Sequence, residues 1–157
     1  MPTRDPAAIR LIVVHWDGVG YIREGYDPLA RYHWLAELHI TRNWGTADKP
    51  IYGSTLMYHE KIDRTGTLYL CRDPRYVLWH ARRANDVGYA INLDASAESA
   101  PTAAQHKTLL WRLDQLCQQF GLGRGDVFGH GELTAYGNAT QCPGEDALRW
   151  LREWRGQ

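Results

Sequence analysis

Short apolar runs alternate along the chain with segments of helical periodicity. Residues 9–16 are mostly apolar and rich in β-branched side chains, which is typical of a strand buried on both faces. Residues 55–63 and 67–72 predict the two strands of a hairpin, with Gly66 at a turn position that favours a positive φ. Two further strands are predicted at residues 87–93 and 126–128.

Three segments carry the start and stop signals of helices. The first begins at Asp27-Pro28, an N-cap followed by proline in the first turn, and is expected to end near Asn43. The second opens with the capping box of Thr102 and Gln105 and ends at Gly121. The last covers residues 146–154. This alternation predicts an α/β fold in which helices flank a central mixed sheet, as a single domain over residues 1–157.

Composition narrows the possible partners. Lysine plus arginine (18) equals aspartate plus glutamate (18), so no long-range field favours nucleic acid or an anionic membrane. No stretch of 18 apolar residues exists, so we expect no membrane insertion. Seven tryptophans and nine tyrosines against two phenylalanines suit a partly wet carbohydrate or peptide groove, although burial in a small core explains them equally well.

The three cysteines show neither a Cys-x-x-Cys pair nor a disulfide spacing. Cys71 falls in a predicted strand and Cys117 on the apolar face of a predicted helix, so both are expected to be inert core residues. Cys142 precedes Pro143-Gly144 in a loop and does not fit that description.

Cys142 forms a candidate metal site with two histidines. His15 ends the first strand and His130 follows the strand at 126–128, and ligands of open α/β sheets gather at the carboxyl ends of strands. Two imidazoles and a thiolate could hold zinc with one position left open, as in catalytic sites. Spacing alone does not decide this, because a lone histidine is more often a structural residue.

Six motifs occur in order between residues 11 and 151: Val13-Val14-His15, Tyr58-His59, Arg64-Thr65-Gly66-Thr67, Trp79-His80-Ala81 with Asn85, Gly129-His130-Gly131-Glu132, and Thr140-Gln141-Cys142-Pro143-Gly144. Together they resemble the zinc-dependent N-acetylmuramoyl-L-alanine amidases, a family that includes phage amidase-type lysozymes and peptidoglycan recognition proteins. The resemblance implies the peptidoglycan recognition protein-like amidase fold. It also implies hydrolysis of the amide between N-acetylmuramic acid and the L-alanine of the stem peptide.

The same resemblance assigns the chemistry. His15, His130 and Cys142 would hold Zn²⁺, which lowers the pKa of bound water to about 7. Tyr58 would lie beside the metal, to stabilise the oxyanion or orient the water. Thr140 replaces a lysine of the phage lysozymes, so it offers a hydrogen bond to the oxyanion but no charge.

Asn92 stands where another branch of the family has a catalytic glutamate, and an amide cannot act as a general base. Proton transfer would then fall to Tyr58, zinc hydroxide or Glu132. For Glu132 we favour a role in orienting a metal-bound histidine. His59 is expected to make a structural hydrogen bond, since adjacent strand residues point to opposite faces.

The resemblance further implies a substrate groove. His80 and Asn85 match groove positions, and three tryptophans could add stacking walls, although core burial is as plausible for each: Trp16, Trp44 and Trp79. The segment between His130 and Cys142 is longer than in the phage lysozymes and could reshape this groove.

Three functions stay open at this stage. We favour a monomeric zinc amidase acting on peptidoglycan or soluble muropeptides. A module that binds muropeptides without cutting them is the rival, and Cys142 argues against it because binding-only relatives lose that ligand. A thiol hydrolase with Cys142 as nucleophile is the third. No signal peptide is recognisable, so we expect synthesis in the cytoplasm and action on the cell wall as a phage endolysin, or in the cytosol as a recycling enzyme.

Overall fold

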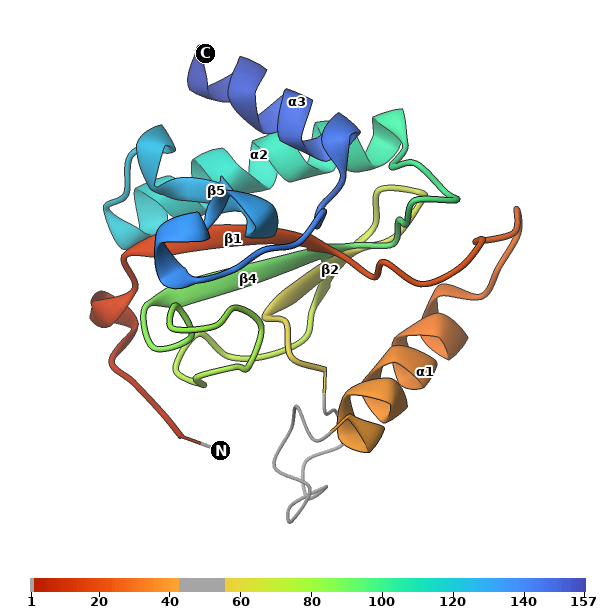
Figure 1. Ribbon diagram of the computed structural model, residues 1–157, viewed down its shortest axis with the longest axis horizontal. Helices are drawn as coiled ribbons and strands as arrows, with labels where there is room; N and C mark the ends of the chain where they lie inside the picture. Colours follow the sequence, from red (N-terminus) through yellow and green to blue (C-terminus); the bar gives the residue numbers. More distant parts are fainter. Residues whose placement is uncertain (1, 43–55) are drawn as a thin grey trace.

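A five-stranded mixed sheet forms the centre of the computed structural model, which describes residues 2–42 and 56–157 (Figure 1). The strand order is β3-β2-β4-β1-β5, where β4 runs parallel to both β1 and β2, β5 runs parallel to β1, and β3 runs antiparallel to β2. The strands are β1 (Leu11–Trp16), β2 (Glu60–Ile62), β3 (Leu68–Leu70), β4 (Gly88–Leu93) and β5 (Val127–Gly129). The predicted α/β class with a mixed sheet is confirmed.

Helices cover both faces of the sheet. The helices α2 (Ala103–Phe120) and α3 (Glu145–Arg155) lie together on one side, and α1 (Pro28–Thr41) lies on the other (Figure 1). The predicted helix signals are present: Asp27 accepts hydrogen bonds from the first turn of α1, and the capping box of Thr102 opens α2. Gly121 ends α2 in the left-handed conformation, with φ 66°.

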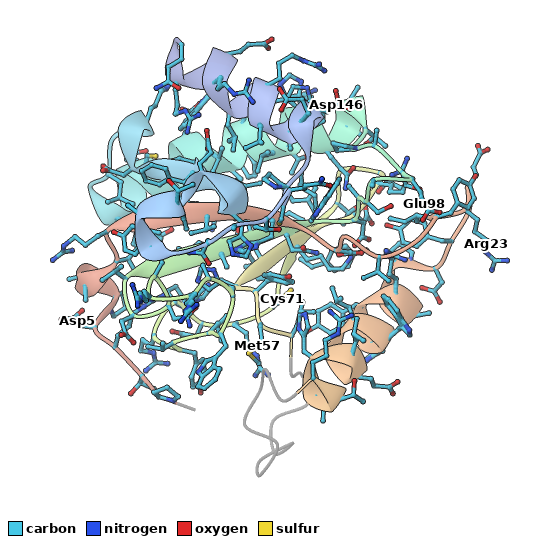
Figure 2. All side chains as sticks on the ribbon, in the orientation of Figure 1. Asp5, Arg23, Met57, Cys71, Glu98 and Asp146 are labelled. Carbon is cyan, nitrogen blue, oxygen red and sulfur yellow. The ribbon has the colours of Figure 1, made fainter. Side chains whose placement is uncertain are left out.

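Strand β1 is buried on both faces, as its continuous apolar run predicts. Ile12 and Val14 join the main core, which is formed with α2 and α3, whereas Leu11 and Val13 pack in a second cluster on the opposite face. Side chains fill the space between the sheet and its helices (Figure 2). Because side chains alternate along a strand, His15 emerges on the face of Val13, away from the main core.

The strand predicted at residues 55–63 is shorter in the structure, where β2 covers only Glu60–Ile62. Among the described residues before it, Met57 donates its backbone N–H to Nδ1 of His39 on α1 at 3.1 Å, so at this position the backbone binds a helix side chain instead of a neighbouring strand. The following turn matches the prediction, with Gly66 at φ 86°. Trp44 and the loop after α1 lie outside the described residues.

No helix in the described part of the chain is long and apolar enough to cross a membrane. Cys71 and Cys117 are free thiols in the structure. Burial raises the pKa of both, to about 12 for Cys71, as expected for unreactive side chains.

Candidate metal centre

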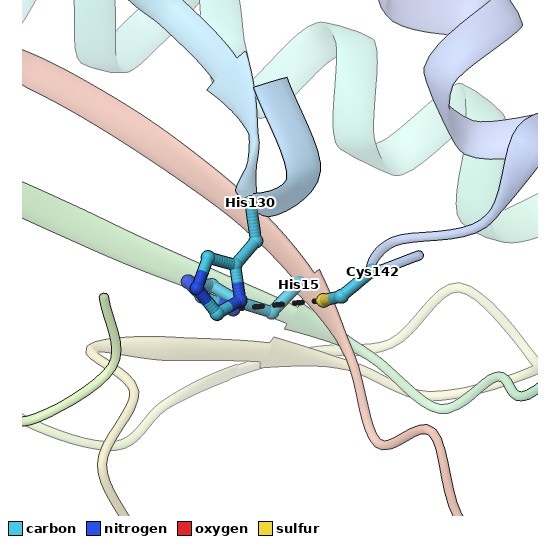
Figure 3. Close-up of side chains that lie close together, drawn as sticks. All are labelled: His15, His130 and Cys142. Atoms are coloured by element: carbon cyan, nitrogen blue, oxygen red, sulfur yellow. Dashed lines mark hydrogen bonds between the residues drawn. The ribbon is translucent and has the colours of Figure 1, made fainter. Parts of the chain in front are cut away.

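His15, His130 and Cys142 come together at one edge of the sheet (Figure 3). One donor atom from each lies within 4.8 Å of the other two, and Nδ1 of His15 is 3.7 Å from Sγ of Cys142. Val14 of β1 pairs with Gly129 of the parallel strand β5. His15 follows Val14 and His130 follows Gly129, so this pairing places the two histidines side by side. The sheet register therefore explains how residues 115 positions apart in sequence meet.

Backbone contacts hold Cys142 in place. The N–H of Trp16 points at Sγ at 3.3 Å, and the carbonyl of Cys142 accepts a hydrogen bond from Gly131 N–H at 2.6 Å. A Cβ at position 131 would overlap the carbonyl oxygen of Thr140, so only glycine fits between the two ligand segments. Gly144, at φ 85°, lies against the ring of Trp16 in the same way.

Each histidine has a side-chain partner at Nε2. Nε2 of His15 lies 3.0 Å from Nδ1 of His80, and Nε2 of His130 lies 3.1 Å from Oδ1 of Asn138. His80 was expected to line the groove, and it both lines the cavity and contacts a ligand. Asn138 could not be found from sequence patterns, because its contact with His130 lies outside every motif.

Glu132 does not orient a histidine, which corrects our expectation for its carboxylate. Both oxygens bind Arg155 of α3, at 2.7 and 3.0 Å, and Oε2 also accepts the N–H of Gly129 at 2.7 Å. Burial alone would raise the pKa of this carboxyl, but the hydrogen bonds from Arg155 and Gly129 lower it. Glu132 is thus an ionised group that fixes the backbone just before His130.

The electrostatics of the three residues suit a cation. Burial lowers the pKa of His15 well below its usual value, as do the neighbouring histidines, and burial also lowers the pKa of His130. Both imidazoles are therefore neutral near pH 7, the form that binds metals. Burial raises the pKa of Cys142 to about 12, against the hydrogen bond from Trp16. Two imidazoles and one cysteine form a donor set that fits Zn²⁺.

A cavity of about 790 Å³ opens over these ligands. Tyr58, only 8% exposed, borders it with its ring centroid 5.1 Å from that of His15. Burial and then the nearby Cys142 raise the pKa of Tyr58 well above 10, so its phenol stays protonated and can donate a hydrogen bond. Thr140 also lines the cavity, and its hydroxyl oxygen accepts the N–H of Cys142 at 3.2 Å.

The other expected groove residues divide into two kinds. Trp79 is 57% exposed on the cavity wall, whereas Trp16 is partly buried there. Asn85 lines the cavity too, and its Oδ1 accepts the N–H groups of His80 and Ala81, which shapes the wall segment. Sequence reasoning missed the cationic lining of the cavity, which comprises Arg42, Arg82 and Arg83.

Asn92 lies deep in the sheet and is not part of the cavity lining. Its Nδ2 donates to Oδ1 of Asp17 at 2.5 Å, and Asp17 in turn pairs with Arg31 at 2.6 Å. His59 makes the structural contacts expected of it, accepting the N–H of Ala90 at Nδ1. Burial and then Arg4 lower the pKa of His59 to about 3.

The mixed sheet, the histidine and cysteine cluster and the open cavity define an α/β domain with a candidate metal site in an open groove. The model of the N-acetylmuramoyl-L-alanine amidase family, Amidase_2, matches residues 5–145. The chain therefore belongs to this family.

Solved structures of several amidases and recognition proteins share the fold. N-acetylmuramoyl-L-alanine amidase LysC from Clostridium intestinale is 20% identical with a TM-score of 0.71, covering 98% of this chain and 89% of that one. The endolysin of Thermus scotoductus bacteriophage Ph2119 is 19% identical (TM-score 0.66; 95% and 86% covered). Peptidoglycan recognition protein-LE, solved with tracheal cytotoxin, is 16% identical (TM-score 0.75; 98% and 84% covered). Among curated protein sequences, none matches the chain.

Proposed function

We propose that this protein is a zinc-dependent amidase that hydrolyses the bond between N-acetylmuramic acid and L-alanine in peptidoglycan. The observation that carries the proposal is the complete donor set of His15, His130 and Cys142 on the floor of a cavity of about 790 Å³. Membership of the amidase family and the likeness to endolysin amidases support it.

The ligands and their neighbours have separate tasks in this proposal. Zinc held by His15, His130 and Cys142 would supply a water of pKa about 7 and polarise the scissile carbonyl. Tyr58 donates a hydrogen bond to the oxygen that gains negative charge, which a protonated phenol near the ligands can do. Thr140 adds a second donor, because its hydroxyl proton is not used by the bond that its oxygen accepts.

Proton transfer falls to Tyr58 rather than to Glu132 or Asn92. Glu132 is engaged by Arg155, and Asn92 is an amide outside the cavity lining. Tyr58 borders the cavity and keeps its proton at neutral pH, so it can protonate the leaving nitrogen and recover the proton from the attacking water.

The two rival functions fit the site less well. A thiol hydrolase needs a cysteine of lowered pKa, whereas burial raises that of Cys142 to about 12. A structural neighbour was solved in complex with tracheal cytotoxin, a monomeric peptidoglycan, so this fold can bind muropeptides, but binding alone does not require a complete metal donor set.

The deciding experiment digests intact sacculi and soluble muropeptides in parallel, with mass spectrometry of the products. We expect free stem peptides that begin with L-alanine, loss of this activity in EDTA, and its return with added Zn²⁺. Cys142→Ser should lower zinc stoichiometry, while Cys117→Ser on α2 should not. Cleavage that persists in EDTA would refute the zinc mechanism, and binding without cleavage would favour the recognition module. Preference for sacculi would support an endolysin, and preference for soluble fragments a recycling enzyme.

A further inference from the structure

Asn138 is a buried amide whose hydrogen-bonding positions are all used. It lies between two ligands in sequence and is 7% exposed. Its Oδ1 accepts the backbone N–H of Arg82 at 3.0 Å and lies 3.1 Å from Nε2 of His130. Its Nδ2 donates to the carbonyl oxygens of Arg82 at 3.1 Å and Leu133 at 3.4 Å.

These contacts fix which way the amide faces. A backbone N–H can only donate and a backbone carbonyl can only accept, so Arg82 alone determines the positions of Oδ1 and Nδ2. A flipped amide would place a donor against the N–H of Arg82 and an acceptor against its carbonyl. Because Oδ1 can only accept, Nε2 of His130 must be the atom that carries the proton.

The tautomer of His130 follows from this orientation. A neutral imidazole protonated at Nε2 has its lone pair on Nδ1, which is then the nitrogen available to a metal. We propose that Asn138 is a positioning residue that selects the Nε2–H tautomer of His130 and presents its Nδ1 lone pair to the metal. This inference deepens the proposed function and rests on the zinc site of His15, His130 and Cys142.

Asn138 also joins the metal centre to the wall of the cavity. It holds both backbone groups of Arg82, and Arg83 follows in a left-handed conformation with φ 59°. His80, two positions before Arg82, is the partner of His15. His15 therefore contacts the wall segment at residues 80–82 directly, and His130 contacts it through Asn138. A change at Asn138 should disturb His130 and this wall segment together.

Two substitutions separate the acceptor from the donor. Asn138→Ala removes Oδ1, whereas Asn138→Asp keeps an acceptor for His130 and Arg82 but loses the two bonds that Nδ2 donates. Thr134→Ala is the matched control, because Thr134 is an exposed polar residue of the same segment. Loss of a partner of a metal-bound histidine typically weakens metal affinity about 10- to 100-fold. We expect this loss for Asn138→Ala, an affinity within about threefold of wild type for Asn138→Asp, and no change for the control.

The direct readout is the tautomer of His130 in the metal-free protein, from two-bond 1H–15N correlation spectra of the imidazole rings. Wild type and Asn138→Asp should show Nε2–H, and Asn138→Ala should show a mixture. An unchanged tautomer in Asn138→Ala, or its loss in Asn138→Asp, would overturn the inference. If the alanine variant does not fold, Asn138→Leu takes its place, because leucine is close to asparagine in size and also lacks an acceptor; an unchanged tautomer there would equally overturn the inference.

Thermal unfolding with and without Zn²⁺ distinguishes positioning from simple stabilisation. A positioning role shrinks the zinc-induced rise in Tm of Asn138→Ala, because the stability that a ligand adds grows with the logarithm of its affinity. A purely structural role lowers the Tm of both forms equally and would contradict the inference. If wild type binds no zinc, the proposed function fails, while the spectra of the metal-free protein still test the contact between Asn138 and His130.

Discussion

Zinc affinity should fall about tenfold for each unit that the pH is lowered below neutrality, because binding displaces one proton. Burial raises the pKa of Cys142 to about 12, so the thiol is protonated before the metal binds. Burial lowers the pKa values of His15 and His130, so both imidazoles are already neutral. Only the thiol has a proton to release, and each zinc ion should release one proton.

Whether zinc can still bind depends on the free energy needed to ionise the Cys142 thiol. Ionising a thiol of pKa about 12 at neutral pH costs about 7 kcal/mol, at about 1.36 kcal/mol for each pKa unit. Zinc sites built from cysteine and histidine in small domains gain about 10–16 kcal/mol at neutral pH even after such costs. A buried thiol is therefore compatible with binding, and it makes the affinity sensitive to pH.

Titration calorimetry in buffers of different ionisation enthalpy counts the released protons. Measurements belong between about pH 6 and pH 7, since above that range a zinc-bound water of pKa about 7 releases a proton of its own. Cys142→Ser should bind zinc more weakly and release less than one proton, whereas Cys117→Ser should match wild type. A count near zero in wild type would show that the thiol is ionised without metal, and a count of two or more would show that the histidines are not neutral.

Three further outcomes are expected. Tyr58→Phe should retain zinc but lower kcat by about 10²–10³-fold, the typical cost of losing one oxyanion donor. Tyr21 is 69% exposed, so the control Tyr21→Phe should behave as wild type. An equal kcat in the two variants would remove the phenol of Tyr58 from catalysis. Gly131→Ala should cost about 1–3 kcal/mol of stability and weaken zinc binding, because the new methyl group overlaps the carbonyl of Thr140. The control Gly125→Ala should do neither, since a Cβ at position 125 has no atom within 4 Å. A Gly131→Ala variant as stable and as zinc-binding as wild type would contradict the packing argument. Burial lowers the folded pKa values of four histidines, His15, His59, His80 and His130, so below about pH 6.5 the unfolded chain binds more protons than the folded one. The stability of the metal-free fold should therefore fall with pH, by up to about 1.4 kcal/mol per pH unit for each histidine. A stability that does not change with pH in chemical denaturation would show that these histidines are not held neutral.

Local signals predicted the helices more accurately than the strands. The cap of α1 and the capping box and terminal glycine of α2 lie within a few residues of the ends they fix, so the sequence around Thr102 and Gly121 was sufficient. Strand β2 depends on partners elsewhere in the chain. Met57 has an apolar side chain suited to a strand, but its N–H binds His39 on α1, and no pattern within residues 55–63 reveals that contact.

The candidate metal centre divides in the same way. The three ligands could be proposed from the sequence because each stands in a motif and two follow parallel strands. Their supporting contacts could not, because these join segments through single atoms. Glu132 stands next to Gly131 in a ligand motif, yet Arg155 from α3 takes its carboxylate. Asn138, in a segment without a recognisable motif, contacts His130 instead.

The amide at position 92 is best explained by the charges around it. Asp17 and Asp94 are two fully buried carboxylates, and each has one cationic partner, Arg31 for the first and Lys61 for the second. Two negative and two positive charges balance, and a buried charge without a partner is strongly destabilising. Asn92 donates to Asp17, so a glutamate at this position would place a second carboxylate against that of Asp17. The carboxylate of Asp17 therefore favours an amide at position 92. In the proposed mechanism, the proton chemistry that a glutamate would supply falls to Tyr58, which borders the cavity.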